Sequence, residues 1–166
     1  FPDQPGAKPL GSVCLPGTDI AYTLPAGNYK IVVPTSNSRT GGYSFSSVLK
    51  QVQTFDWTLG EKIEKDRVGN RPAPGAGNLE AHGHADVYRI QVTPQQAGTW
   101  VFDASNGSAA CAASLTPVNP AGKPLGSICG RREYHLEPGE YQLEVSALRR
   151  GLSNGGGSYW ITSTRT

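Results

Sequence analysis

The sequence of 166 residues contains no methionine, no long apolar run and no marked excess of either charge. No apolar stretch approaches the roughly 20 residues that a membrane-spanning helix requires. The 15 basic and 13 acidic residues leave a formal net charge of +2, which argues against the clustered basic surface that binds nucleic acid or an anionic membrane. Because the chain starts at Phe1 and shows no charged-then-apolar leader, we expect a processed or excised N-terminus.

Glycine and proline are abundant instead, with 21 and 13 residues, and they interrupt the chain too often for long helices. Between them, apolar and polar residues alternate with the period of two that is typical of extended strands. The alternating segments are 29–33, 43–45, 55–59, 87–92, 100–102, 141–145 and 159–161. Short strands separated by turns in this way predict an all-β fold, an antiparallel sandwich or barrel.

Residues 64–77 do not follow this alternation. They are first charged and then rich in proline, glycine and alanine, without any hydrophobic period. This composition predicts a long surface loop. We interpret it as a tolerated insertion in preference to a functional loop, although loops on sandwiches often carry function.

A repeat within the chain is the most specific signal of the sequence. Residues 5–14 match residues 120–129 at an offset of 115, and the same order of turn and apolar residues continues in both copies. The continued matches are 24–29 with 136–141 and 41–45 with 157–161. We therefore expect residues 54–166 to form one complete sandwich repeat and residues 1–53 to form the second half of another.

A half sandwich leaves an unpaired strand edge and an open apolar face. For this reason we expect residues 1–53 to pack against a partner. The candidates are a missing half-repeat on another chain, a neighbouring copy of the protein, or residues 54–166.

Several short motifs occur in an order that resembles the bacterial pre-peptidase C-terminal domain family. They are Gly77-Asn-Leu-Glu80, Gly83, Asp86-Val-Tyr88-Arg-Ile90, Ala97-Gly-Thr-Trp-Val-Phe102, Leu136-Glu-Pro-Gly-Glu-Tyr141 and the glycine-rich turn before Tyr159. The resemblance implies a jelly-roll-like β-sandwich that is appended to secreted or cell-surface bacterial proteins, usually as a non-catalytic module. Some members of the family bind calcium or an insoluble polymer such as collagen.

Two metal sites are suggested by residues 80–86. Glu80 and Asp86 offer hard oxygen ligands on either side of a glycine-containing turn, which suits calcium. His82, His84 and Asp86 point to one face of an extended chain and would suit a transition metal. The structural alternatives are that Asp86 caps a turn, in place of the calcium site, and that the two histidines are simply exposed, in place of the transition-metal site. Calcium suits these residues better than a transition metal does, but we favour the structural alternatives over both sites and expect no certain cofactor.

Tryptophan offers a binding surface. If Tyr159 and Ile161 face the core, the intervening Trp160 faces outward, and an exposed tryptophan is uncommon unless it meets a ligand. Trp57 and Trp100 alternate in step with core residues, so we expect them to be buried.

Three cysteines complete the set of candidate residues. Cys111 and Cys129 lie on successive predicted strands of the complete copy, so we expect a disulfide between them. Cys14 is the repeat equivalent of Cys129, and the equivalent of Cys111 would lie upstream of Phe1. We therefore expect Cys14 to be unpaired or bridged to another chain. The alternative is that all three cysteines are buried and reduced.

From these features we expect a non-catalytic, extracellular or cell-surface module for adhesion, substrate targeting or domain spacing. The alternative is a structural fragment of a proteolytically processed enzyme or toxin whose active site lies elsewhere. A small metal-dependent hydrolase is the least favoured reading, because the chain has only three histidines and no serine in a nucleophile elbow.

Overall fold

The computed structural model divides the chain into two compact units, residues 1–47 and 48–166. It describes residues 22, 24, 26–32, 50–80, 83–105, 113–128, 130–146 and 157–166. The predicted boundary between residues 53 and 54 lies within the first strand of the second unit, and the repeat boundary stays a prediction.

In the first unit, four of the described large apolar side chains are exposed, and Tyr29 is half-buried. The four are Tyr22, Leu24, Ile31 and Val32, with exposed fractions of 42% to 67%. The strand predicted at 29–33 is wrong over its described part, because only Tyr29 forms a single β-bridge there. The strand predicted at 43–45 lies outside the described residues.

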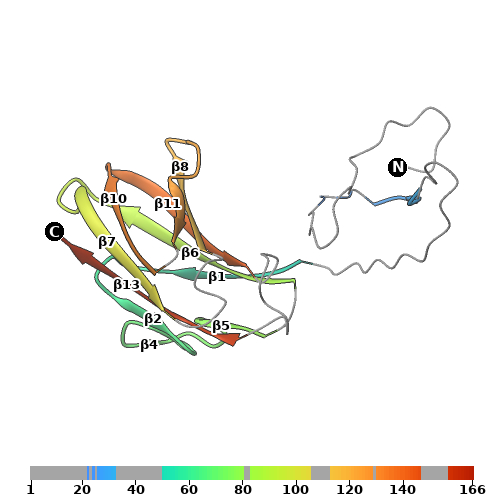
Figure 1. Cartoon of the computed structure of the whole chain (residues 1–166), viewed down its shortest axis with the longest axis horizontal. Coiled ribbons are helices and arrows are strands. Elements are labelled where there is room, and N and C mark those ends of the chain that lie inside the picture. Colours follow the sequence, from blue (N-terminus) through green and yellow to red (C-terminus); the bar gives the residue numbers. More distant parts are fainter. Residues whose placement is uncertain are drawn as a thin grey trace, which may run out of the picture. The chain divides into compact units, whose positions relative to one another are not determined.

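The unit 48–166 is a β-sandwich, which confirms the predicted all-β fold (Figure 1). One sheet has five strands in the order β1 (Gln51–Asp56), β6 (His84–Val92), β11 (Gly139–Ser146), β8 (Ala113–Asn119) and β9 (Gly126–Ile128). The other has six, in the order β10 (Gly130–Leu136), β7 (Gly98–Ser105), β13 (Trp160–Arg165), β2 (Lys62–Glu64), β3 (Arg67–Val68) and β4 (Arg71–Pro72). A small third sheet pairs β12 (Gly157–Ser158) with β5 (Asn78–Leu79). None of the described residues lies in a helix, so none of them forms a helix that could cross a membrane.

One strand pair departs from the predicted antiparallel arrangement. Strand β1 runs parallel to β6, with Gln51 opposite His84 and Asp56 opposite Arg89. The chain leaves β1, passes through β2, β3 and β4 in the other sheet, and returns to the first sheet as β6. Such a crossover allows two strands of one sheet to run in the same direction. All other pairs between the strands β1 to β13 that the structure describes are antiparallel.

The core lies between the two large sheets and is formed by the alternating apolar residues that the sequence shows. On β6, the side chains of Tyr88, Ile90 and Val92 are at most 2% exposed, while Arg89 and Gln91 between them are exposed. The predicted burial of Trp57 and Trp100 is confirmed, with exposed fractions of 2% and 6%. Both indole nitrogens donate to main-chain oxygens, so each buried ring keeps its polar group satisfied.

The predicted surface loop at 64–77 is only partly correct. This segment adds β3 and β4 to the edge of the six-stranded sheet and buries Ala76 completely. Asp66 adopts a left-handed conformation with φ of 60°, which turns the chain tightly between β2 and β3. The main chain of Asp66 then bonds Ala73 and Ala76, and its carboxylate accepts a hydrogen bond from the Gly75 N–H at 2.9 Å. The segment therefore folds around Asp66. The amino-acid composition of 64–77 does not predict this arrangement.

Candidate functional site

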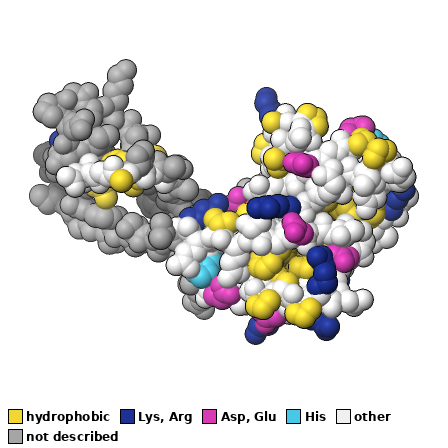
Figure 2. All heavy atoms as spheres, turned by 180° about the vertical axis from the view of Figure 1, so that it is seen from behind, with side chains coloured by type: hydrophobic (Ala, Val, Ile, Leu, Met, Phe, Trp, Pro, Cys, Tyr) yellow, Lys and Arg dark blue, Asp and Glu magenta, His cyan; other side chains and the backbone are white. Residues whose placement is uncertain are grey.

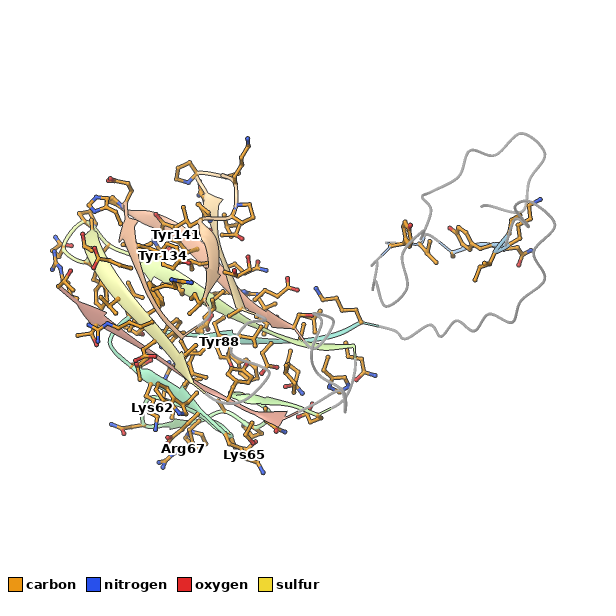
Figure 3. The ribbon with its side chains drawn as sticks, viewed as in Figure 1. Lys62, Lys65, Arg67, Tyr88, Tyr134 and Tyr141 are labelled. Atoms are coloured by element: carbon orange, nitrogen blue, oxygen red, sulfur yellow. The ribbon has the colours of Figure 1, made fainter. Side chains whose placement is uncertain are left out.

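A buried polar cluster joins the two sheets. Asp86 and Tyr88 alternate on β6, so both side chains point inward, and they are 1% and 0% exposed. Tyr159, which immediately precedes β13, approaches them from the other side and is 3% exposed. Figure 3 shows Tyr88 lying between the sheets.

Hydrogen bonds connect the members of this cluster directly. The Tyr159 hydroxyl donates to Oδ2 of Asp86. The Tyr88 hydroxyl lies 2.8 Å from the Tyr159 hydroxyl and 3.4 Å from Oδ2 of Asp86. It accepts a hydrogen bond from the Gly77 N–H at 2.8 Å, which leaves its own hydrogen free to donate to one of these two oxygens. We call Asp86, Tyr88 and Tyr159 the Asp-Tyr cluster.

Gly77 is required at its position beside this cluster. Its φ is +65°, and a Cβ atom there would lie 2.4 Å from the main-chain carbon of Glu64. A side chain would therefore strain the backbone and collide with the β2–β3 turn. The Gly77 carbonyl also accepts a hydrogen bond from the Tyr159 N–H at 2.8 Å, so this glycine holds both tyrosines in place.

The environment of the cluster shifts the proton affinity of its members. Burial raises the pKa of Asp86 to about 6, and the negative charge of the nearby Glu80 adds to this increase. The hydrogen bond from Tyr159 acts in the opposite direction and lowers the pKa. Burial also raises the pKa of Tyr88 and Tyr159 above the ordinary value for tyrosine. Both tyrosines are therefore protonated hydrogen-bond donors at neutral pH.

A second polar group adjoins the cluster at Glu80. Oε2 of Glu80 lies 2.9 Å from Nδ1 of His84 and accepts a weaker hydrogen bond from Nε2 of Gln53 at 3.4 Å. Oε1 of Gln53 is buried and has no hydrogen-bond partner. The amide nitrogen of Gln53 faces Glu80, while Oε1 lies against Gly75, where a Cβ atom would be 2.2 Å from it. A buried acceptor without a donor is a feature that a bound cation would satisfy.

This arrangement fits the predicted calcium ligands in donor type. Glu80 contributes a carboxylate, Asp86 a second one nearby, and Gln53 an uncoordinated amide oxygen, all of them hard donors. Gln53 could not be predicted as a member of this site from the sequence, because nothing in its local pattern indicates that β1 runs beside β6.

The transition-metal site at His82, His84 and Asp86 stays a prediction, as the calcium site does. His84 pairs with Glu80, and His82 lies outside the described residues. Within the part of the chain that the structure describes, no group of three His, Cys, Asp or Glu side chains converges as metal ligands do. Cys14, Cys111 and Cys129 also lie outside the described residues, so their pairing stays a prediction.

Trp160 lies on the outer face of the six-stranded sheet. Its neighbours Tyr159 and Ile161 are 3% and 1% exposed and point inward, so the indole points away from the core and is half-buried. The predicted facing of these three residues is therefore confirmed, whereas a role of Trp160 in ligand binding stays a proposal.

Polar side chains share this outer face with Trp160. Nζ of Lys62 lies 6.0 Å from the ring centroid and 2.7 Å from Oε2 of Glu64, which lowers the pKa of Glu64. Thr162 follows Trp160 on the same face and lies opposite Lys62 in the β13–β2 pair. We call Trp160, Thr162, Lys62 and Glu64 the Trp160 face. Figure 3 shows Lys62, Lys65 and Arg67 on the β2–β3 side of the sandwich, away from Tyr88.

Comparisons with known proteins find similarity of structure alone. No protein family model matches the sequence, and neither does any curated protein. The chain is similar in structure to the pre-peptidase C-terminal domain of a collagenase from Bacillus anthracis, with a TM-score of 0.45 and 14% identity over 72% of this chain and 100% of that one. It is also similar to a periplasmic inhibitor of g-type lysozyme from Aeromonas hydrophila, with a TM-score of 0.39 and 13% identity over 69% of this chain and 100% of that one. The first of these is a domain of the kind that the sequence motifs resemble.

Proposed function

We propose that this protein is a non-catalytic, secreted or cell-surface β-sandwich module that holds an extracellular polymer on its Trp160 face. The observation that carries the proposal is that Trp160, on the outer face of a regular sheet, is only partly buried. A structural tryptophan in this unit is buried, as Trp57 and Trp100 are. An indole that remains on the surface is suited to contact with a ligand.

The composition of the face favours a polysaccharide. The flat indole can stack on the apolar side of a sugar ring, and the Thr162 hydroxyl, the Lys62 ammonium and the Glu64 carboxylate can exchange hydrogen bonds with sugar hydroxyls. Figure 2 shows acidic and basic side chains interspersed over one side of the 48–166 unit, with no patch of a single charge there. Such a mixed surface suits an uncharged polymer better than a polyanion.

The buried polar groups support a structural role for the interior. The Asp-Tyr cluster uses its hydroxyl and carboxylate groups in bonds between the two sheets, and its three side chains are at most 3% exposed. A polymer has no access to groups so deeply covered, so we assign the cluster to stability and place polymer binding on the outer face.

Co-sedimentation of the full chain with insoluble chitin, cellulose, peptidoglycan and collagen fibrils tests this function. We expect binding to at least one polysaccharide, and we expect Trp160→Ala to weaken that binding by about tenfold or more. Val118→Ala is the matched control, because Val118 is 45% exposed on β8 of the other sheet. Binding to collagen alone would favour a protein-fibre ligand, and equal binding by Trp160→Ala and the parent chain would overturn the proposal.

We further propose that calcium binds at Glu80 and Asp86 and stabilises the sandwich. The proposal is supported by the proximity of the two carboxylates, since the charge of Glu80 raises the pKa of Asp86. Gln53, whose Nε2 faces Glu80 and whose Oε1 is unpartnered, offers a third hard donor if its amide turns over. Thermal melts with calcium, with magnesium and with EGTA should show a higher midpoint in calcium only. Glu80→Gln should abolish that gain, whereas Glu140→Gln, at an exposed position of β11, should preserve it. Equal midpoints in calcium and EGTA would contradict the site.

A further inference from the structure

The two large sheets end in four edge strands, and three of them carry features that oppose pairing with another chain. These edges are β1 and β9 in one sheet and β10 and β4 in the other. Strand β4 has two residues and ends in Pro72, and β9 has three residues and starts with Gly126. Strand β10 carries Arg131, Arg132 and Glu133 in succession. Short length, proline and charge are the means by which natural edges avoid further strand addition.

Strand β1 lacks these features. It has six residues, Gln51–Asp56, without glycine or proline and without a charge before its last residue. Its outward side chains are accessible, and Val52 is 51% exposed. Of the four described edge strands, β1 is therefore the one without a feature that opposes pairing with another strand.

The hydrogen bonds of β1 show which main-chain groups are free. The N–H of Gln51 donates to Gly83 at 3.0 Å and that of Trp57 donates to Arg89 at 2.9 Å. Because main-chain groups alternate in direction along a strand, the odd-numbered residues face β6, while Val52, Thr54 and Asp56 face away from it. The Asp56 carbonyl accepts from Nη2 of Arg71 at 3.1 Å, which agrees with this direction. Within the part of the chain that the structure describes, no hydrogen bond reaches the main chain of Val52 or Thr54 from outside the sheet.

We propose that β1 pairs antiparallel with β1 of a second copy of this chain. The order of residues from Lys50 to Asp56 is self-complementary about Gln53. A two-fold axis at Gln53 places Val52 opposite Thr54 of the second copy, so that the free main-chain groups of both residues meet. It also places Lys50 opposite Asp56 of the second copy, a cation opposite an anion at both ends of the pair. Opposite charges across a strand pair stabilise it and fix its register.

The contacts that Lys50 and Asp56 already make are compatible with this pairing. Nζ of Lys50 lies 2.6 Å from Oε1 of Glu144, and its side chain is 35% exposed. An ammonium group has three donors, so a second carboxylate can be bound beside the first. Arg71 bonds the carbonyl of Asp56 and not its carboxylate, which leaves the carboxylate accessible. A single strand pair buries little surface, so the dimer should be weak and dependent on concentration.

Sedimentation equilibrium of the full chain at low ionic strength tests the proposal. Over roughly 10 µM to 1 mM, a range that covers weak association, the average mass should rise from one copy towards two. Thr54→Pro should abolish the rise, because it removes an N–H that points away from β6 and leaves the β1–β6 ladder intact. An unchanged thermal midpoint confirms that this variant is folded. A dimer that survives Thr54→Pro, or a chain that stays monomeric throughout, would overturn the proposal.

A charge exchange separates this register from any other dimer. Lys50→Asp alone and Asp56→Lys alone should each weaken association by at least about fivefold, because each places like charges opposite one another at both ends. The double variant restores opposite charges across the axis and should recover most of the association. The double variant still lacks the Lys50–Glu144 ion pair and still carries a lysine at position 56 beside Arg71, so the contacts within each chain remain as disturbed as in the single variants. Recovery of association would therefore come from the contacts between the two copies. Failure of the double variant to associate better than either single variant would contradict the register. Pairing with a strand of an unrelated protein would leave the purified chain monomeric and would also contradict the proposal.

Discussion

Tyr159 and Asp86 lie in different parts of the sandwich and are joined by a hydrogen bond from the tyrosine hydroxyl to the carboxylate. The two residues are separated by 73 positions in the chain, and they bring the start of β13 against β6. A buried carboxylate is costly unless it is bonded. This bond therefore favours one placement of the two sheets, in which both tyrosines meet Asp86.

The raised pKa of Asp86 makes the stability of the sandwich depend on pH. Below about pH 3 the carboxyl is mostly protonated in both the folded and the unfolded chain, because its pKa is 3.8 or higher in each, so no stability is lost. As the pH rises towards 6, the unfolded chain ionises while the folded chain retains the proton, because the pKa is about 6 in the fold against an ordinary 3.8. The free energy of unfolding should therefore fall by about 3 kcal/mol over this window.

Asp86→Asn isolates this contribution. The amide does not titrate, so the difference in the free energy of unfolding between variant and parent should shift by about 3 kcal/mol between pH 3 and pH 7, in favour of the variant at pH 7. Urea unfolding in the presence of EGTA measures it without interference from bound calcium. A difference that is constant with pH would show that Asp86 titrates normally.

Removal of the Tyr159 hydroxyl should destabilise the fold. Tyr159→Phe leaves the ring in place but takes away the donor to Asp86, so we expect a loss of about 1–3 kcal/mol in urea unfolding. Tyr134→Phe is the matched control, because the Tyr134 hydroxyl donates to the main chain of Ser127 at 3.2 Å in an exposed position. An equal loss in the free energy of unfolding for the two variants would show that the bond to Asp86 stabilises the fold no more than the exposed bond of Tyr134 does.

Trp100 and Trp160 should differ strongly in their contribution to stability. Trp100→Ala removes a ring that is 6% exposed and should cost about 3–5 kcal/mol. Trp160→Ala, on the outer face, should cost less than about 1 kcal/mol. Chemical unfolding of both variants checks the difference, and similar costs would contradict the orientation of β13.

The cysteine pairing stays a prediction that peptide mapping can test. The described residues next to Cys111 and Cys129 lie on paired strands, with Ala113 opposite Ile128. A disulfide between the two cysteines should stabilise the unit by roughly 3 kcal/mol. Mapping under non-reducing conditions should recover a Cys111–Cys129 peptide. A peptide that links Cys14 to either of them would refute the pairing.

The sequence predicted the strands whose own residues alternate. The segments 87–92, 100–102, 141–145 and 159–161 all lie within or beside described strands, and their inward residues are the core. It did not predict the direction of β1 or the fold of 64–77. The first depends on a crossover through the other sheet, and the second depends on the left-handed conformation of Asp66. Neither feature has a local hydrophobic period.

The candidate site was predicted only in parts. Asp86 and Trp160 were identified from their own neighbours, because alternation fixes which way a strand residue faces. The contact between Tyr88 and Tyr159 joins residues 71 positions apart, and Gln53 reaches Glu80 across 27 positions. One signal did exist for the cluster. An aspartate in step with buried apolar residues, as Asp86 is with Tyr88 and Ile90, requires donors from the facing sheet.

The central claim is that the Trp160 ring contacts the bound polymer, and an aromatic replacement tests it most directly. On whichever polysaccharide the full chain binds, the dissociation constant should be measured for the parent, Trp160→Phe, Trp160→Ala and Val118→Ala. We predict that the phenylalanine variant keeps most of the affinity, that the alanine variant loses about tenfold or more, and that Val118→Ala binds like the parent. Parent-like affinity of Trp160→Ala would contradict the account.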